Sequence, residues 1–233
     1  MATLRERRGT DVNLRSAPQM REYVALANRI AADRPGTVLD WGCGWGQLSA
    51  LLAEREVDVR AFDYRPAEAE PGEAPLERFP EIVCTYSPDP VALPFADASF
   101  DAALSCGVLE HVADPAGSLA ELHRVLRPGG RLYVAKLPNR ASYLEWLAKR
   151  LGLYYHGQLP HDTLWSPAEA RAAVARQGFD VTDARYANML PLTVDHPLAT
   201  RLAGAIWTLN RLLERVPLLS RLATNVELDA VRR

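Results

Sequence analysis

TVLDWGCGWGQLS, residues 37–49, joins a short apolar strand to the start of a helix through three glycines. Val38 and Leu39 form the apolar run, Asp40 ends it, and a helical pattern opens at Gln47. Glycines at every second position let the backbone turn tightly and let a ligand approach the main chain, because they carry no Cβ. We therefore expect a ligand at this turn.

The glycine spacing differs from that of a dinucleotide site. Gly42, Gly44 and Gly46 give G-x-G-x-G, whereas the dinucleotide fingerprint G-x-G-x-x-G has its third glycine one position later. The acidic Asp40 would repel a pyrophosphate, but it can pair with an ammonium group. The turn alone is also compatible with a purely structural role, so other motifs have to identify its ligand.

Strand-like and helix-like segments alternate along the rest of the chain. This alternation predicts a parallel sheet with right-handed crossovers and a ligand at the carboxyl ends of the strands. Asp63 follows the second strand, where an acid can accept both hydroxyls of a ribose. Residues 66–80 are expected to form a loop, and RPGG at 127–130 a turn. Helices are predicted at 18–33, 47–55, 115–126, 140–151 and 167–177, and further strands at 57–62, 81–85, 100–105, 131–137, from GFDV at 178–181, and at 224–232.

The composition limits the class of protein. A chain of 233 residues with a formal net charge of −2 predicts one domain and no nucleic-acid partner, because nucleic-acid binding requires a basic surface. Cys43, Cys84 and Cys106 lie far apart in apolar surroundings, which is typical of reduced thiols in a cytosolic protein. The sequence has no apolar signal segment and no run long enough to span a membrane, so we expect a cytoplasmic protein. The arginine-rich residues 1–17 are expected to form a flexible arm.

Five motifs follow one another in a fixed order: VLDWGCGWG (38–46), AFDYRP (61–66), DPVALPFADASFD (89–101), LEHV (109–112) and LHRVLRPGGRLYV (122–134). With them, the chain resembles the class I S-adenosylmethionine-dependent methyltransferases, particularly the branch that contains ubiquinone- and menaquinone-biosynthesis enzymes and many small-molecule methyltransferases. The resemblance covers about residues 37–135.

The resemblance implies an α/β fold in a single domain of residues 1–233. This fold is a Rossmann-like, seven-stranded, mostly parallel sheet with helices on both faces and an antiparallel last strand. Residues 37–135 would form the cofactor-binding half. Residues 136–233 would form the substrate-side half, with a helical insertion at about 195–223.

The resemblance also implies the cofactor S-adenosylmethionine, whose product is S-adenosylhomocysteine. Asp40 and the three glycines would cradle its methionine part, Asp63 would accept the ribose hydroxyls, and Asp89 would contact the adenine amino group. Trp41 and Trp45 are bulkier than the residues usual in the family. We expect Trp45 to contact cofactor or substrate, or else to pack in the core. The complete set of expected cofactor-binding residues is Asp40, Trp41, Gly42, Cys43, Gly44, Trp45, Gly46, Asp63, Tyr64, Asp89, Pro90, Val91, Ser105, Cys106 and Gly107.

The candidate catalytic residues are His111, His156 and His161. Methyl transfer from a sulfonium mainly requires alignment of the reacting atoms, and a hydroxyl acceptor additionally benefits from a general base. The resemblance places His111 near the transferred methyl group; its alternative is a structural role at a helix start. The other two histidines lie in a loop expected on the acceptor side, and their H-x4-H spacing lacks the cysteine partners of a typical zinc site.

We expect no metal and no hydrolase chemistry. Some quinone O-methyltransferases carry E-x-x-E-H at the end of the fourth strand, but Gly107 replaces the first glutamate here. Glu110 and His111 alone make a poor divalent site. The sequence also lacks the G-x-S-x-G motif of a nucleophilic serine.

The predicted activity is methyl transfer to a small molecule, to an oxygen of an aromatic or polyketide-like natural product. The near alternative is a quinone or lipid methyltransferase acting at a membrane surface, and an alternative of another class is a non-catalytic cofactor-binding partner protein. The insertion at 195–223 is expected to cover the substrate pocket or to form a homodimer surface, although an arginine-flanked apolar helix can also lie on a bilayer. Its leucine and isoleucine residues recur at helical spacing: Leu198, Leu202, Ile206, Leu209 and Leu213.

Overall fold

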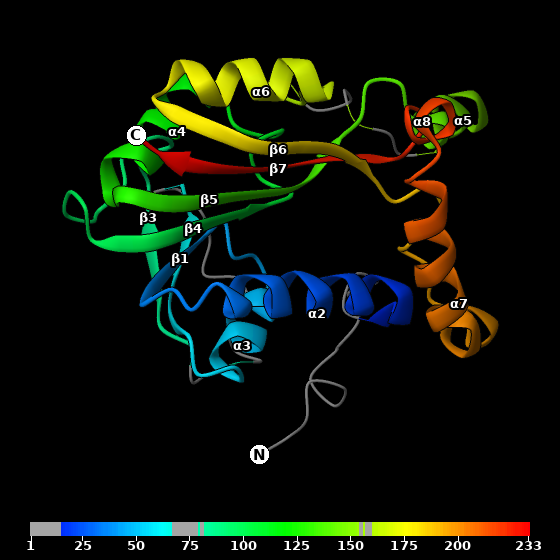
Figure 1. Cartoon of the computed structure of the whole chain (residues 1–233), viewed down its shortest axis with the longest axis horizontal. Helices are drawn as coiled ribbons and strands as arrows, with labels where there is room; N and C mark the ends of the chain where they lie inside the picture. Colours follow the sequence, from blue (N-terminus) through cyan, green and yellow to red (C-terminus); the bar gives the residue numbers. More distant parts are fainter. Residues whose placement is uncertain (1–14, 67–78, 80–81, 154–155, 157–159) are drawn as a thin grey trace.

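A seven-stranded sheet forms the middle of the computed structural model (Figure 1), which describes residues 15–66, 79, 82–153, 156 and 160–233. The strand order is β3-β2-β1-β4-β5-β7-β6. Strands β1 to β5 run parallel to one another, whereas β7 runs antiparallel to both β5 and β6. This topology confirms the predicted fold. The strands are β1 (Thr37–Trp41), β2 (Asp58–Tyr64), β3 (Cys84–Ser87), β4 (Phe100–Cys106), β5 (Leu126–Pro138), β6 (Phe179–Ala187) and β7 (Asn225–Arg232).

Helices cover both faces of the sheet, with α2 and α3 on one face and α4 and α6 on the other (Figure 1). Consecutive residues of β1 are buried on opposite faces of the sheet, because side chains alternate along a strand. Val38 is buried in the cluster that includes α2 and α3, and Leu39 in the cluster that includes α4 and α6. The helices are α2 (Ala17–Ala32), α3 (Gln47–Ala53), α4 (Pro115–Val125), α5 (Tyr143–Leu151), α6 (Pro167–Arg176), α7 (Pro197–Leu213) and α8 (Pro217–Ser220).

Capping residues set the starts of several helices. The side chains of Ser16, Asp114 and Ser166 accept backbone N–H groups at the starts of α2, α4 and α6, and each helix has proline in its first turn. The helix predicted at 140–151 starts later, at Tyr143, because Ser142 is its cap.

Two strands differ in extent from the prediction. β3 begins at Cys84, late in the predicted segment 81–85, and extends two residues beyond it to Ser87; residue 81 lies outside the described residues. The predicted RPGG turn belongs to β5, where the register jumps from Leu126 opposite Phe100 to Arg131 opposite Ala102. The RPGG residues therefore bulge out of the β4–β5 ladder.

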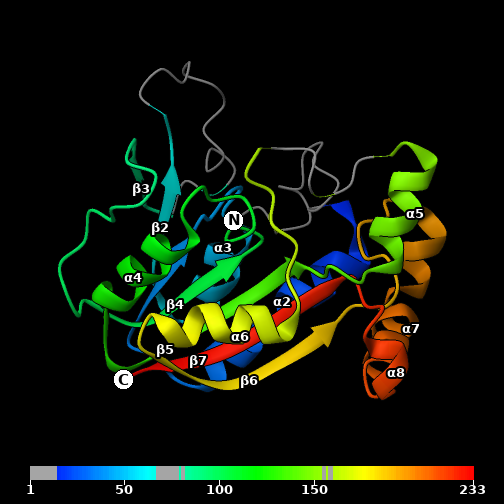
Figure 2. The same cartoon turned by 90° about the horizontal axis from the view of Figure 1, so that it is seen from above.

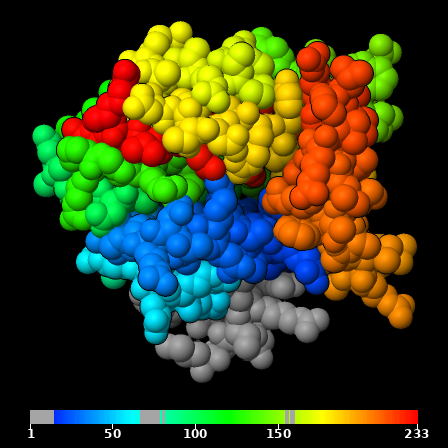
Figure 3. Space-filling view, in the orientation of Figure 1, coloured from blue at the N-terminus to red at the C-terminus, as the bar shows by residue number. Residues whose placement is uncertain are grey.

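The insertion at 195–223 forms α7 and the short α8. Figures 1 and 2 place α5, α7 and α8 together at one end of the sheet, and Figure 3 shows α7 beside α2 on the surface. The buried Glu22 of α2 holds α7 in place, since its carboxylate accepts from Trp207 Nε1 at 3.1 Å and from Arg211 at 2.5 Å. Throughout the described part of the chain, every helix is too short or too polar to cross a bilayer.

The end of the predicted arm is anchored to the domain. Arg15 forms an ion pair with Asp195 at 2.7 Å, and the Ser16 hydroxyl donates to the Leu192 carbonyl. The rest of the arm, residues 1–14, lies outside the described residues, as does most of the loop predicted at 66–80.

Candidate functional site

A cavity of about 600 Å³ opens at the carboxyl ends of β1, β2 and β4. Its size is within the usual range for small-molecule pockets. The sheet order explains its place, because β1 lies between β2 and β4 and the turns after these parallel strands meet at one edge. Of the expected cofactor-binding residues, those that line the cavity are Trp41, Gly42, Gly44, Asp63, Tyr64, Asp89, Pro90, Val91 and Gly107.

The glycine turn forms one wall of the cavity. Gly42 and Gly44 have φ of +72° and +51°, a region that glycine adopts most readily. A Cβ on Gly42 would lie 2.4 Å from Cγ2 of Val108, so this position has no room for a side chain. The Gly42 N–H also donates to the Phe62 carbonyl at 2.9 Å, which ties the turn to the end of β2.

Asp63 presents its carboxylate to the cavity from the end of β2. Its oxygens accept the N–H groups of Gly44 at 3.0 Å and of Tyr64 at 2.9 Å. Burial raises the pKa of Asp63, while these two backbone donors oppose the shift. The side chain is thus fixed in a position from which its remaining lone pairs can accept ligand hydroxyls.

Asp40 lies beneath the glycine turn, outside the cavity lining. It is 2% exposed, and its Oδ2 accepts the Ser49 hydroxyl at 2.6 Å. Burial raises the pKa of Asp40 to about 6, with the Ser49 hydrogen bond opposing the shift and the nearby Asp63 adding to it.

Asp89 shapes the opposite part of the lining. Its Oδ1 accepts the N–H groups of Val91 and Ala92, both at 2.8 Å, and these bonds lower its pKa. The carboxylate therefore holds the turn that brings Pro90 and Val91 to the cavity.

The remaining expected cofactor residues lie behind the wall. Trp45 packs against the core cluster that contains α2, as in the second of its two predicted roles, and Gly46 is the left-handed cap of α3. Ser105 is buried, and burial raises the pKa of Cys106 to about 12.

The cysteine pair lies in a small core cluster shared by β2 and β3. Cys43 Sγ is 3.6 Å from Cys84 Sγ, and both residues, like Cys106, are free thiols.

Two of the three candidate catalytic histidines line the cavity, and the third lies against one of them. His111 and His161 belong to the lining, and the His156 ring stacks on the His111 ring with centroids 5.9 Å apart. His111 Nδ1 is 2.8 Å from Asp162 Oδ1, and His156 Nδ1 is 2.6 Å from Glu145 Oε1. Burial lowers the pKa of His156, but the Glu145 carboxylate outweighs it, so this pKa is raised overall.

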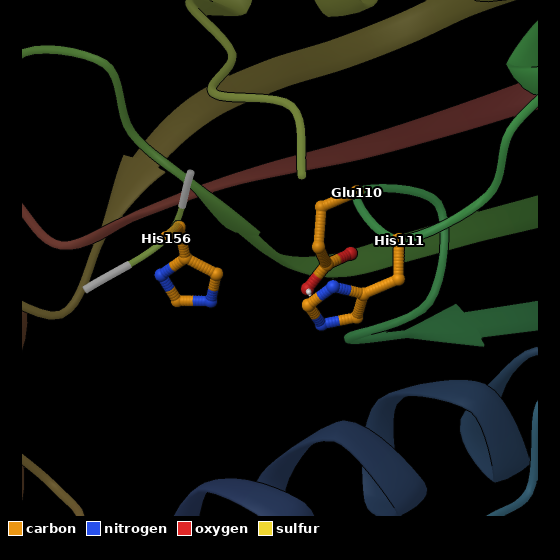
Figure 4. Close-up of side chains that lie close together, drawn as sticks. All are labelled: Glu110, His111 and His156. Carbon is orange, nitrogen blue, oxygen red and sulfur yellow. Dashed lines mark ion pairs between the residues drawn. The ribbon is translucent and has the colours of Figure 1, made fainter. Parts of the chain in front are cut away.

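The Glu110 carboxylate lies next to the His111 ring (Figure 4). The side chain of Glu110 is 2% exposed, and burial raises its pKa. The backbone carbonyl of Glu110 accepts the Thr163 N–H at 2.8 Å. This bond fixes the loop that carries Asp162 against the turn that carries His111.

Sequence reasoning missed the carboxylates that hold the histidines. Asp162 directly follows the candidate His161, which was the one available signal. Glu145 lies on α5 and has no recognisable motif. Further lining residues, outside the expected cofactor-binding set, are Phe62, Val108, Val112 and Ala113.

The insertion contributes no described residue to the lining of this cavity. α7 instead exposes a row of leucines to solvent, which are Leu198, Leu202, Leu209 and Leu212. The predicted roles for the insertion, a cover over the pocket, a homodimer surface or a membrane contact, stay predictions.

Known proteins resemble this chain over the same segments. Residues 39–134 match the family model described as a methyltransferase domain. The demethylmenaquinone methyltransferase of Renibacterium salmoninarum is 36% identical over 58% of this chain and 59% of its own length, so the chain spans less than two thirds of that relative. The ubiquinone biosynthesis O-methyltransferase of Pseudomonas paraeruginosa is 31% identical over 70% of this chain and 72% of its own length.

The fold also matches solved structures. One is the Burkholderia thailandensis 1,6-didemethyltoxoflavin-N1-methyltransferase with bound 1,6-didemethyltoxoflavin and S-adenosylhomocysteine. It is 22% identical with a TM-score of 0.59, and the match covers 96% of this chain and 82% of that one. At this identity the match shows the fold alone. The Pseudomonas relative, of which the chain covers more than two thirds, and the matching family model show the family. The chain belongs to the class I S-adenosylmethionine-dependent methyltransferases.

Proposed function

We propose that the protein transfers a methyl group from S-adenosylmethionine to an oxygen of an aromatic or polyketide-like small molecule. The observation that carries this proposal is a single cavity lined both by the glycine turn with Asp63 and by His111. A methyl donor and an acceptor can meet in one place there. On this proposal, residues 37–135 hold the cofactor and residues 136–233 contribute the acceptor side.

The residues present fit the cofactor that the family implies. Gly42 and Gly44 line the cavity and carry no side chain, which leaves the main chain there open to a ligand. Asp63 is fixed by two backbone donors and can accept a pair of ribose hydroxyls. The Asp40 carboxylate lies under the turn, where it can attract an ammonium group. When bound, the cofactor supplies a methyl group on a sulfonium, which is an activated leaving group.

His111 is the proposed general base in the metal-free protein. Asp162 accepts a hydrogen bond at Nδ1, so the proton of the neutral imidazole lies on Nδ1 and Nε2 can accept another. Nε2 of His111 would take the proton of the acceptor hydroxyl as its oxygen bonds to the methyl carbon and the carbon–sulfur bond breaks, with S-adenosylhomocysteine as the leaving group. The Asp162 carboxylate would stabilise the resulting imidazolium. We propose that His161 and His156 orient the acceptor beside His111.

Labelled cofactor and a panel of phenols and hydroxylated polyketides test the proposal, with mass spectrometry to locate the added methyl group. We expect His111→Ala to lower kcat by about 10²- to 10⁴-fold and to leave the affinity for S-adenosylhomocysteine unchanged in calorimetry. The control is His196→Asn, at the cap of α7, where asparagine also caps well; it should keep full turnover. Equal losses of turnover and binding in His111→Ala, or a wild-type chain that binds no S-adenosylhomocysteine, would refute the proposal.

A quinone or lipid acceptor at a membrane surface is the second candidate. The exposed leucines of α7 favour it, and the two relatives above are named for demethylmenaquinone and for ubiquinone biosynthesis. A non-catalytic cofactor-binding protein is less well supported, because His111 and His161 line the same cavity as the glycine turn.

A further inference from the structure

We propose that Glu110, His111 and His156 together bind one divalent transition-metal ion beside the cavity. Each residue offers a ligand atom, and these atoms all lie within 4.8 Å of one another. Figure 4 shows that two of the residues come from the turn after β4 and that His156 comes from a separate loop. The tertiary fold therefore adds a third ligand to a pair that is too small to hold an ion by itself.

The two imidazoles are oriented as metal ligands usually are. Asp162 Oδ1 lies 2.8 Å from Nδ1 of His111, and Glu145 Oε1 lies 2.6 Å from Nδ1 of His156. Carboxylates at one ring nitrogen fix the ring and raise the basicity of the other, which is the common outer shell of histidine metal sites. An ion would consequently bind both rings through Nε2. The rings are nearly parallel, with 22° between their planes.

The glutamate supplies an independent observation. Its side chain is 2% exposed, and Oε1 lies 3.8 Å from Nε2 of His111. The other oxygen, Oε2, is buried and accepts no hydrogen bond from the described residues. A buried acceptor without a donor is costly. A cation between Glu110 and the two rings would satisfy this oxygen.

The local charge also suits a dication. Glu110, Glu145 and Asp162 contribute three carboxylates around the two imidazole rings, and the buried Lys136 lies near Glu110. A bound dication compensates the excess negative charge that remains. Burial of unbalanced carboxylates is otherwise unfavourable.

The distances require only a small adjustment. Metal–ligand bonds to nitrogen and carboxylate oxygen are about 2.0–2.2 Å, so two ligands of one ion can be at most about 4.4 Å apart. The present ligand atoms, within 4.8 Å of one another, need to approach by a few tenths of an ångström.

The donor set selects the kind of ion. Two imidazoles and one carboxylate with open positions suit Zn²⁺, Fe²⁺, Co²⁺ or Mn²⁺, whereas Mg²⁺ and Ca²⁺ prefer oxygen ligands. The prediction of no metal rested on Glu110 and His111 alone. His156, which lies far along the chain from both, could not enter that reasoning.

The role of the ion rests on the proposed methyl transfer. Because His111 lines the cavity, an acceptor hydroxyl can reach an open position of the ion, whose charge lowers the pKa of that hydroxyl. The hydroxyl proton then leaves to solvent water, and the oxygen attacks the methyl carbon as the carbon–sulfur bond breaks. In this form Nε2 of His111 is a ligand, so the ion takes over the activation of the acceptor.

Titration of the chelator-stripped full chain with Co²⁺, followed by its visible d–d absorption, tests the site. We expect one Co²⁺ per chain, competed by Zn²⁺ and not by Mg²⁺. Affinity should fall at least about 100-fold in His156→Ala and Glu110→Gln, and about 10- to 100-fold in Glu145→Gln, which only loosens the ring of His156. His161→Ala, in the same loop but outside the cluster, is the matched control and should bind Co²⁺ like the wild type.

Two results would overturn the site: no stoichiometric Co²⁺ absorption, or an unchanged affinity in both His156→Ala and Glu110→Gln. Circular dichroism checks that each variant is folded. If His156→Ala does not fold, the more conservative Glu145→Gln still tests the contribution of His156 to Co²⁺ binding. Binding of S-adenosylhomocysteine separates the two proposals. A chain that binds Co²⁺ but not S-adenosylhomocysteine would support the metal site and refute the methyltransferase function. Turnover that does not depend on the metal would refute only the activating role of the ion.

Discussion

Replacing Asp40 by asparagine should stabilise the cofactor-free protein and weaken its cofactor binding at the same time. Asp40 is 2% exposed, and burial raises its pKa from 3.8 to about 6. At neutral pH the fold therefore holds a carboxylate that would be more stable in water. A shift of this size corresponds to about 3 kcal/mol of lost stability above pH 6.

The sign follows from proton linkage. The folded-state pKa of Asp40 is higher than its unfolded value, so the folded state binds more protons and its stability falls as pH rises through this range. Asparagine does not titrate, and its Oδ1 can still accept the Ser49 hydroxyl. The difference in unfolding free energy between Asp40→Asn and the wild type should therefore grow by about 2 kcal/mol between about pH 4.5 and pH 7.

Urea unfolding at several pH values measures this difference, and calorimetry with S-adenosylhomocysteine measures the binding. In the wild type, affinity should decline as pH falls below about 6, because Asp40 loses the charge that attracts the ammonium group. In Asp40→Asn the affinity should be low and should lack this component. Ser49→Ala is the companion variant, since it removes the hydrogen bond at 2.6 Å and should destabilise the fold.

A pH-independent stability difference between Asp40→Asn and the wild type would contradict the reasoning. It would mean that burial does not destabilise the ionised form of the Asp40 carboxyl group. Unchanged S-adenosylhomocysteine affinity in the variant would remove Asp40 from the cofactor site.

Three further changes test other parts of the structure. Asp63→Ala should lower S-adenosylhomocysteine affinity at least about tenfold in calorimetry, whereas Asp58→Ala at the opposite end of β2 should not; equal affinities would place the ribose elsewhere. Gly42→Ala should cost about 1–3 kcal/mol of unfolding free energy in urea, because its Cβ meets Val108 and its φ is +72°; a second change, Val108→Ala, should restore part of the loss. In co-sedimentation with anionic vesicles the chain should stay in the supernatant, and sedimentation that Leu202→Glu abolishes would favour the quinone or lipid acceptor.

The fold and the part of the cavity lined by the glycine turn and Asp63 could be predicted because their signals are local. The glycine turn follows β1 directly and Asp63 ends β2, so one crossover brings both to the same edge. The burial of Asp40 and the packing of Trp45 against the α2 layer could not be foreseen in the same way. Both depend on how neighbouring helices pack against the turn, and a short sequence motif does not contain this information.

The acceptor side was predictable only as a set of histidines. Asp162 is 51 residues from His111, and the fold brings them together through the loop between α5 and α6. Glu145 reaches His156 from α5, and Glu22 fixes α7 from α2. Each contact joins polar side chains that are ordinary in their own segments. Their function arises from tertiary packing, and sequence periodicity does not reveal it.

If the proposed activity holds, the position of Val108 limits how the protein can be redesigned. This side chain fills the space that a Cβ on Gly42 would need, and it also lines the cavity within three residues of His111. Trimming it to admit a bulkier acceptor would at the same time loosen the support of the glycine turn. Directed evolution of acceptor scope at this residue should thus alter the affinity for the methyl donor as well, and libraries would have to vary residues 42 and 108 as a pair.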